Sequence, residues 1–82
     1  MSQAQKRLQD MRANPMGWTM EDVEVVSRAY GVSCEPPSRG GHYKISHRTQ
    51  SDILTIPKRP RIKPVYIKRF VSFVDAVAGA RS

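Results

Sequence analysis

The sequence predicts a small α+β protein in which a three-stranded antiparallel sheet is covered by helices on one face. Three observations support this fold class. A segment near the C-terminus carries apolar residues at helical spacing. Three short stretches before it are rich in β-branched or alternating residues and are separated by turn-forming residues. A capped amphipathic segment precedes them, so the predicted strands stand in a row between two helices.

Residues 1–17 are expected to form an extra N-terminal helical arm. Ser2 is a suitable N-cap, and good helix formers follow it. Leu8 and Met11 give the arm a thin apolar stripe, and an Asn-Pro-Met-Gly turn ends it. We therefore predict two regions, this arm and a main domain over residues 18–79.

The first helix of the main domain is expected to begin after Thr19. The hydroxyl of Thr19 is a suitable cap, and Glu21 and Asp22 follow it where a helix dipole favours acids. Gly31 is a natural end for this helix.

Three short strands are expected next, over residues 32–35, 42–47 and 53–56. Pro36 and Pro37 end the first strand, because proline cannot donate to a β-ladder. Another proline closes the third strand. Such a row of short strands favours an antiparallel meander.

The final helix is expected to begin at Pro64, since proline fits the first helical position, and to stop at Gly79. Its apolar face is formed by Ile67, Phe70, Val71, Val74, Val77 and Ala78. If both helices of the main domain cover one face of the sheet, its other face is open to solvent.

The second strand is predicted to place a histidine on that open face. His42, Lys44 and Ser46 point to one side of an extended strand, and Tyr43 and Ile45 point to the other. Ile45 marks the core side, so His42 is expected to face water beside a cation. Histidine is the side chain that exchanges protons near neutral pH, so this face is a candidate site for proton transfer.

Gly40 and Gly41 precede this strand, and they let the backbone turn sharply or approach a ligand closely. The chain carries a net charge of +7, which is unevenly distributed. Residues 1–37 hold four bases and five acids, net −1, whereas residues 38–82 hold ten bases and two acids, net +8. A basic half of this kind indicates a polyanion or an acidic protein as partner.

The densest positive charge runs from Lys58 to Arg69, where twelve residues contain six cations and no acid. Cations of this kind neutralise phosphates, so RNA binding should weaken as salt rises. The residues expected to contact phosphates are Arg39, Lys44, Arg48, Lys58, Arg59, Arg61 and Lys63. The alternative is a solvated loop that only keeps the protein in solution.

RNA carries its own nucleophile, the 2′-hydroxyl, so a base that removes its proton is sufficient to start cleavage. His42 is the candidate base, and Lys44 with the loop arginines would stabilise the charge that develops on the phosphate. This chemistry requires no metal and no small-molecule cofactor. The alternative is an idle surface histidine, which is the commoner situation.

Other residue classes exclude several functions. The single cysteine, Cys34, provides neither a disulfide nor a cysteine-based zinc site and is expected to pack as a small residue. His47 falls on the opposite strand face from His42, so a structural role is favoured over a metal pair or a proton donor. No apolar run predicts a membrane span or a signal peptide, and we expect a cytoplasmic protein.

Four features follow one another along the chain: the helix, Gly40-Gly41-His42, the Leu-Thr-Ile-Pro strand and the basic segment that leads into the last helix. With these features in this order, the chain resembles a HicA-type toxin over residues 18–78. Ile45 takes the apolar place of the family motif, and His47 matches a second histidine that is common in it. Gly41 stands where the family usually has serine or threonine, so a hydroxyl that contacts phosphate or orients the histidine is missing.

This resemblance implies a fold similar to double-stranded-RNA-binding domains and an endoribonuclease that cleaves mRNA and blocks translation. It implies that His42 is the single essential catalytic residue and that a HicB-type antitoxin covers the active face. Two alternatives stay open. One is a non-catalytic nucleic-acid-binding module of the same fold, and the other is a basic face that mainly binds an acidic protein.

Overall fold

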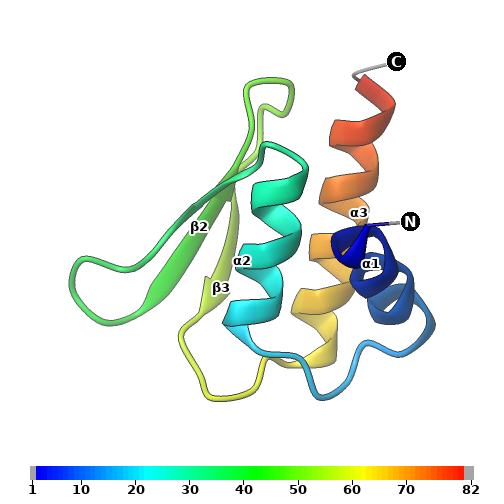
Figure 1. Ribbon diagram of the computed structural model, residues 1–82. Helices are drawn as coiled ribbons and strands as arrows, with labels where there is room; N and C mark the ends of the chain where they lie inside the picture. Colours follow the sequence, from blue (N-terminus) through cyan, green and yellow to red (C-terminus); the bar gives the residue numbers. More distant parts are fainter. Residues whose placement is uncertain (1, 81–82) are drawn as a thin grey trace.

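The computed structural model describes residues 2–80 and shows a small α+β fold (Figure 1). The three strands form one antiparallel meander in the order β1-β2-β3, as predicted. The elements, in chain order, are α1 (Gln3–Ala13), α2 (Met20–Ala29), β1 (Ser33–Glu35), β2 (His42–Ser46), β3 (Leu54–Pro57) and α3 (Pro64–Ala80).

Both N-terminal helices begin at the caps that the sequence predicts. The Ser2 hydroxyl accepts a hydrogen bond from the backbone N–H of Gln5, and the Gln5 side chain accepts one from the Ser2 N–H, each at 3.1 Å. At α2 the Asp22 carboxylate accepts from the backbone N–H of Thr19 at 3.1 Å and from its hydroxyl at 3.0 Å. The reciprocal pair of bonds at Ser2 and the two bonds from Thr19 to Asp22 fix where the helices start.

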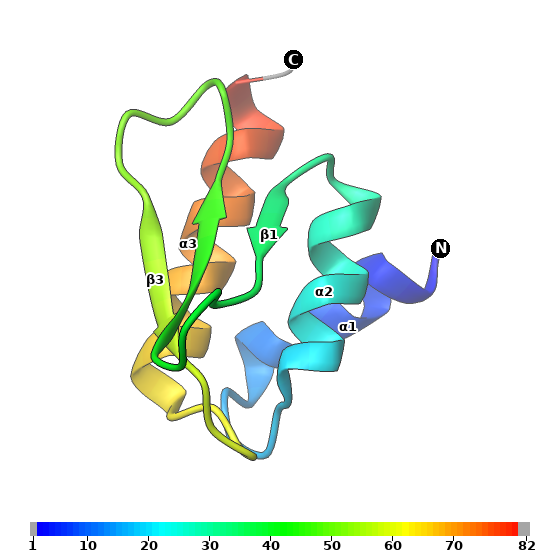
Figure 2. The ribbon, with the colours of Figure 1, turned by 90° about the vertical axis from the view of Figure 1, so that its left-hand side faces the viewer.

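The helices lie on one side of the sheet, which leaves the other side uncovered. α2 packs against β1 and α3 packs against β3, while α1 packs against both helices (Figure 1). Turning the molecule brings the uncovered side of the sheet to the front, with the helices behind it (Figure 2). We call this uncovered side the open face. The fold therefore has the single exposed sheet surface that the sequence predicts.

α1 is bound firmly to the other helices. Met11 is 1% exposed and belongs to the same apolar cluster as residues of the sheet and of α3. Arg12 forms a two-fold ion pair with Asp75 of α3, with 2.9 Å between Nη2 and Oδ1, and Arg7 lies 3.3 Å from Asp22 of α2. The hydrogen bond from Arg12 lowers the pKa of the Asp75 carboxyl.

Several element ends differ from the prediction. β1 begins at Ser33, β2 ends at Ser46 and β3 begins at Leu54, each one residue inside the expected strand. Two elements also end later than expected. β3 runs one residue further than expected and includes Pro57, which pairs with His42. Proline is tolerated there because β3 is an edge strand. α3 continues through Gly79, which keeps a helical conformation instead of turning the chain, since a helix interior accepts glycine at a cost of about 1 kcal/mol. No helix in the described range 2–80 is long and apolar enough to cross a membrane.

Candidate functional site

The strand register decides which side chains meet on the open face. Glu35, Lys44 and Thr55 lie in one row across the three strands, and the neighbouring row pairs His42 with Pro57. His42 and Lys44 are both exposed, as expected for outward positions of β2. The structure thus places the predicted base and the predicted cation next to each other on the same uncovered surface.

The alternate residues of β2 and β3 point the other way, into the core. Ile45 and Ile56 are completely buried, and Tyr43 is half-buried against the same cluster. Because successive side chains alternate across a strand, burying Ile45 fixes His42 and Lys44 on the solvent side. Packing of the core therefore determines which way His42 and Lys44 point, although the core side chains lie on the other face of the sheet.

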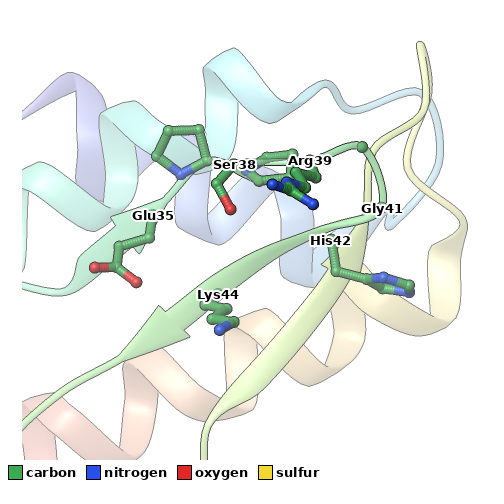
Figure 3. A pocket seen from close by; sticks show the side chains of 9 residues that line it. Glu35, Ser38, Arg39, Gly41, His42 and Lys44 are labelled. Carbon is green, nitrogen blue, oxygen red and sulfur yellow. The ribbon is translucent and has the colours of Figure 1, made fainter.

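His42 lies at the rim of a surface hollow of about 520 Å³, which we call the His42 hollow. Its walls are the β1–β2 turn, residues 36–41, together with Glu35, His42 and Lys44. Figure 3 shows Arg39, His42 and Lys44 on the solvent side of the sheet, with the helices behind. Two fixed cations and an imidazole around an open hollow are groups that can receive an anion.

The turn that precedes His42 requires glycine because of its backbone conformation. Gly40 and Gly41 have φ angles of +30° and +112°, which side-chain-bearing residues rarely adopt. Space is available, since a Cβ on Gly41 would meet only the backbone oxygen of Arg39, at 3.8 Å. A hydroxyl-bearing residue at position 41, as in the HicA motif, therefore requires a different turn shape.

The cationic loop between β3 and α3 begins beside this turn. The backbone N–H of Lys58 donates to the carbonyl oxygen of Gly41 at 2.8 Å, and that of Ile62 donates to Trp18 at 3.0 Å. Ile62 is 3% exposed, so it anchors the loop in the core. The exposed cations of this loop are Lys58, Arg59, Arg61 and Lys63. The loop thus starts beside the backbone of Gly41, which precedes His42. Of the predicted phosphate-binding cations, however, only Arg39 and Lys44 line the hollow itself.

The electrostatics of this region are dominated by unpaired positive charge. The ion pairs seen within residues 2–80 involve Arg7 and Arg12, and none involves the hollow or the cationic loop. Glu35 is the one acid of the His42 hollow, and it stands on β1. The region as a whole therefore attracts a polyanion, and Glu35 weakens that attraction on the β1 side.

The second histidine of the motif lies in a different environment. His47 follows the end of β2, and its Nδ1 accepts a hydrogen bond from the backbone N–H of Thr49 at 3.1 Å, with the Thr49 hydroxyl at 2.7 Å. It lines a second hollow of about 680 Å³ at the other end of the strand. The imidazole of His47 stabilises the turn, in agreement with the structural role that the sequence favours. The imidazole of His42, by contrast, has no side-chain partner within residues 2–80.

The structure separates one predicted phosphate ligand from the others. Arg48 lines the His47 hollow, so it lies away from His42 and does not extend the His42 site. Sequence reasoning also missed two residues, Glu35 and Ser38, which line the His42 hollow. An acid at a strand end and a serine in a turn carry no distinctive pattern. The register between β1 and β2 brings Glu35 to the site, and the shape of the turn brings Ser38 there.

Aromatic side chains that could stack on bases point elsewhere. Tyr43 is half-buried on the core side of β2, and Tyr66 packs against the core while the guanidinium of Arg69 lies 5.9 Å from its ring centre. Within the described strands, the open face holds no Phe, Tyr or Trp. Contact with RNA at this face would therefore depend on phosphates more than on base stacking.

Cys34, the central residue of β1, faces the helices rather than the site. It is half-buried, and burial together with the nearby Glu24 raises the pKa of its thiol to about 11. A thiol held in its protonated form is a poor nucleophile and a poor metal ligand. Within residues 2–80 no three His, Cys, Asp or Glu side chains gather as a metal site would require.

No protein family matches the chain, and no curated protein or solved structure matches it either.

Proposed function

We propose that this chain is a metal-independent endoribonuclease that cleaves mRNA, and that it acts in the cytoplasm as the toxin of a toxin–antitoxin pair. The observation that carries the proposal is the exposed imidazole of His42 on the open face, in one hollow with Arg39 and Lys44. The order α2-β1-β2-β3-α3 also agrees with the double-stranded-RNA-binding-like fold that the HicA resemblance implies.

The proposed step uses the RNA's own 2′-hydroxyl. His42 takes the 2′-proton, the 2′-oxygen forms a bond to the adjacent phosphorus, and the bond from phosphorus to the 5′-oxygen breaks. The 5′-oxygen takes a proton from solvent or from the imidazolium, which leaves a 2′,3′-cyclic phosphate and a 5′-hydroxyl. No external nucleophile is consumed, so no bound metal is required to generate one.

Arg39 and Lys44 would hold the phosphate that reacts. Both cations line the hollow that His42 borders, and neither is neutralised by an acid within residues 2–80. Positive charge fixed beside the phosphate stabilises the extra negative charge that develops during attack. A positioned base adds roughly 10²–10⁴ in rate, so one histidine with two cations predicts a slow ribonuclease.

The test compares two histidine variants on mRNA in the presence of a chelator. Wild type should produce fragments that end in a 2′,3′-cyclic phosphate, and His42→Ala should produce none above background. His47→Ala is the matched control, because it removes the other imidazole of the same motif without touching the hollow. Cleavage that persists in His42→Ala, or that disappears when the chelator is added, contradicts the proposal.

The proposed partner is a HicB-type antitoxin that covers the open face. A partner of this kind must present acids to the positive charge around His42 and must exclude RNA from the hollow. Expression of the wild-type chain alone should arrest growth, and His42→Ala should not. Coexpression with an acidic protein encoded next to this chain should restore growth and should protect His42 in hydrogen-exchange measurements on the complex.

A second candidate is a nucleic-acid-binding module without catalysis. Two observations favour it: Gly41 supplies no hydroxyl, and the hollow holds one imidazole rather than an acid–base pair. This candidate predicts salt-sensitive RNA binding without a cleavage product. The same chelator assay separates it from the nuclease, because binding would then be measurable in wild type while the RNA stays intact.

A further inference from the structure

A second surface lies on the helix side of the sheet, at the outer edge of β3. Here β3 and α3 form a groove of about 390 Å³, which we call the edge groove. Its β3 side is residues 52–54, and its α3 side is Val65, Lys68, Arg69 and Ser72, which share one face of the helix. The edge groove shares no lining residue with the His42 hollow.

The edge groove has an apolar floor that the fold leaves uncovered. Ile53 is 59% exposed and Val65 is 45% exposed. Three large apolar side chains are exposed within residues 2–80, and these two line the same groove, while the third, Met16, lies in the loop after α1. Scattered exposed apolar residues need no explanation, but two that face each other across a groove indicate a contact surface.

The backbone beside the groove is ready to accept another strand. Gly41 and Lys58 lie opposite each other, next to the pair of His42 with Pro57, and the Lys58 N–H donates to the Gly41 carbonyl. Gly41 and Lys58 are therefore a hydrogen-bonded pair that continues the β2–β3 ladder. Hydrogen-bonded and non-hydrogen-bonded pairs alternate in an antiparallel sheet, so the pair of Lys44 with Thr55 is non-hydrogen-bonded. The N–H and C=O of Thr55 therefore point away from β2, toward the outer edge of the sheet, since β3 is the last strand in the order β1-β2-β3.

The charged side chains at the rim of the edge groove indicate which kind of strand could bind beside β3. Lys68 and Arg69 line the groove opposite a single acid, Asp52, and neither cation is ion-paired within residues 2–80. The Arg69 guanidinium rests 5.9 Å from the Tyr66 ring centre, which holds it near the helix surface. A second copy of this chain would bring the same cations and a net charge of +7 against them, whereas an acidic segment would be attracted.

We propose that an extended acidic segment of a partner protein docks at this edge and adds a fourth strand to β3. Its backbone would bond to Thr55, and every second side chain would point to the helix side and fill the groove over Ile53 and Val65. Apolar and acidic residues would follow one another on that same face, so that the acids meet Lys68 and Arg69 in the groove. This docking does not depend on the proposed nuclease activity, because the edge groove and the His42 hollow lie on different sides of the sheet.

The test uses a synthetic blocked peptide of about eight residues, the length of an ordinary strand, in which serine alternates with valine and glutamate in turn (Ser-Val-Ser-Glu-Ser-Val-Ser-Glu). Valine and glutamate then lie on the same strand face and can enter the groove together. Binding to the full chain is measured by calorimetry, and amide exchange of Thr55 is followed by NMR. The expected result is saturable binding that slows exchange at the Thr55 N–H and shifts the signals of Val65 and Ser72. A peptide of the same composition with its valines at odd positions and its glutamates at even positions should bind more weakly, because the two kinds of side chain then lie on opposite faces of the strand.

Two variants probe separate parts of the docking surface. Thr55→Pro removes the outward N–H without removing a bond to β2, and it should abolish binding. Lys68→Glu with Arg69→Glu lies on an exposed helix face and should weaken binding about tenfold or more, since each surface ion pair is worth up to about fivefold. Lys6→Glu with Arg28→Glu is the charge-matched control away from the groove and should bind like wild type.

Three outcomes would overturn the proposal. The first is no binding of the alternating peptide, or equal binding by the groove variant and the charge-matched control. The second is dimerisation of the chain that the groove substitutions abolish, which would make a second copy the occupant. The third is RNA protection of Lys68 and Arg69 with no effect of Thr55→Pro, which would assign the rim to nucleic acid.

Discussion

The two faces of the three-stranded sheet perform different tasks with alternate residues of the same strand. On the inner face, Ile45 is completely buried and Tyr43 is half-buried against the helices. On the open face, His42 and Lys44 are exposed and border a hollow. Stability and the candidate chemistry therefore depend on side chains that are neighbours in the sequence and yet do not share an environment.

This difference means that the two properties can be altered separately. A substitution on the open face removes few contacts, so its effect on unfolding should be small. A substitution on the inner face leaves a cavity but does not touch the hollow. The five predictions below test this separation, from the largest expected effect to the smallest.

His42→Ala should lower the rate of RNA cleavage by roughly 10²–10⁴, because it removes the only imidazole in the His42 hollow, which is the proposed base. The free energy of unfolding should stay within about 0.5 kcal/mol of wild type, since the side chain is exposed. Cleavage rates and urea unfolding are measured on the same preparations. Equal losses of activity and stability would contradict the separation of the two faces.

Ile45→Ala should lower the stability of the fold, whereas His42→Ala lowers the rate of cleavage. This side chain is completely buried, so its truncation should lower the free energy of unfolding by about 2–5 kcal/mol. Lys44→Ala, the adjacent position on the open face, is the matched control and should cost less than about 0.5 kcal/mol. Urea titrations give both values. A larger loss for Lys44→Ala than for Ile45→Ala would reverse the assignment of the faces.

Cys34 tests the inner face through its reactivity. Its pKa is raised from 9.0 to about 11, and each of these two pKa units lowers the thiolate fraction tenfold. Alkylation by iodoacetamide at pH 8 should therefore be about 100-fold slower in the folded chain than in urea. Because burial favours the protonated thiol, its contribution to stability is complete below pH 9.0 and is lost as pH rises through about 11. Equal alkylation rates in both states would place Cys34 in solvent.

Arg39→Ala combined with Lys44→Ala should weaken RNA binding and reduce its salt dependence. If each cation contacts one phosphate, the slope of log affinity against log salt should fall by about 1.4, at about 0.7 for each contact. Arg48→Ala is the comparison, since Arg48 lines the other hollow and should leave the slope unchanged. Filter binding at several salt concentrations gives the slopes. A larger change for Arg48→Ala would move the binding site to the His47 end.

His47→Ala should produce the smallest effect, and that effect should be on stability. The substitution removes an acceptor for the Thr49 N–H in an exposed turn, so the loss should be about 1 kcal/mol or less. Cleavage of RNA by this variant should stay close to that of wild type. The midpoint of thermal unfolding and the cleavage rate are the measurements. Loss of cleavage without loss of stability would give His47 a catalytic role and would join the two hollows into one site.

Local sequence predicted the elements and the orientation of His42 correctly. The caps at Ser2 and Thr19 involve residues at most three positions apart, so the sequence contains all of their partners. The alternation around Ile45 likewise depends on the geometry of a single strand. Two of the element ends that differ from the prediction, at Pro57 and Gly79, are places where a weak local preference is overridden by strand pairing or by continuation of a helix.

The composition of the site could be predicted only in part. The cations Arg39 and Lys44 were found because they are close to His42 in the sequence, and both line its hollow. Arg48 is also near His42 in the sequence, although further from it than Arg39 or Lys44, but it lies at the other end of β2, where it lines the His47 hollow. Glu35 was missed because its place opposite Lys44 depends on the register between β1 and β2, which no single segment determines.

The sequence by itself determined the α+β class, the helix starts, the exposed position of His42 and the excess of positive charge in the second half of the chain. Each of these follows from local geometry or from composition. Tertiary structure alone decided that the cationic loop starts beside the glycine turn, through the bond from Lys58 to Gly41, and that α1 packs on α2 and α3. It also decided that β3 keeps an outer edge beside an apolar groove. These features depend on contacts between distant segments, and such contacts form only when the core fixes how those segments pack.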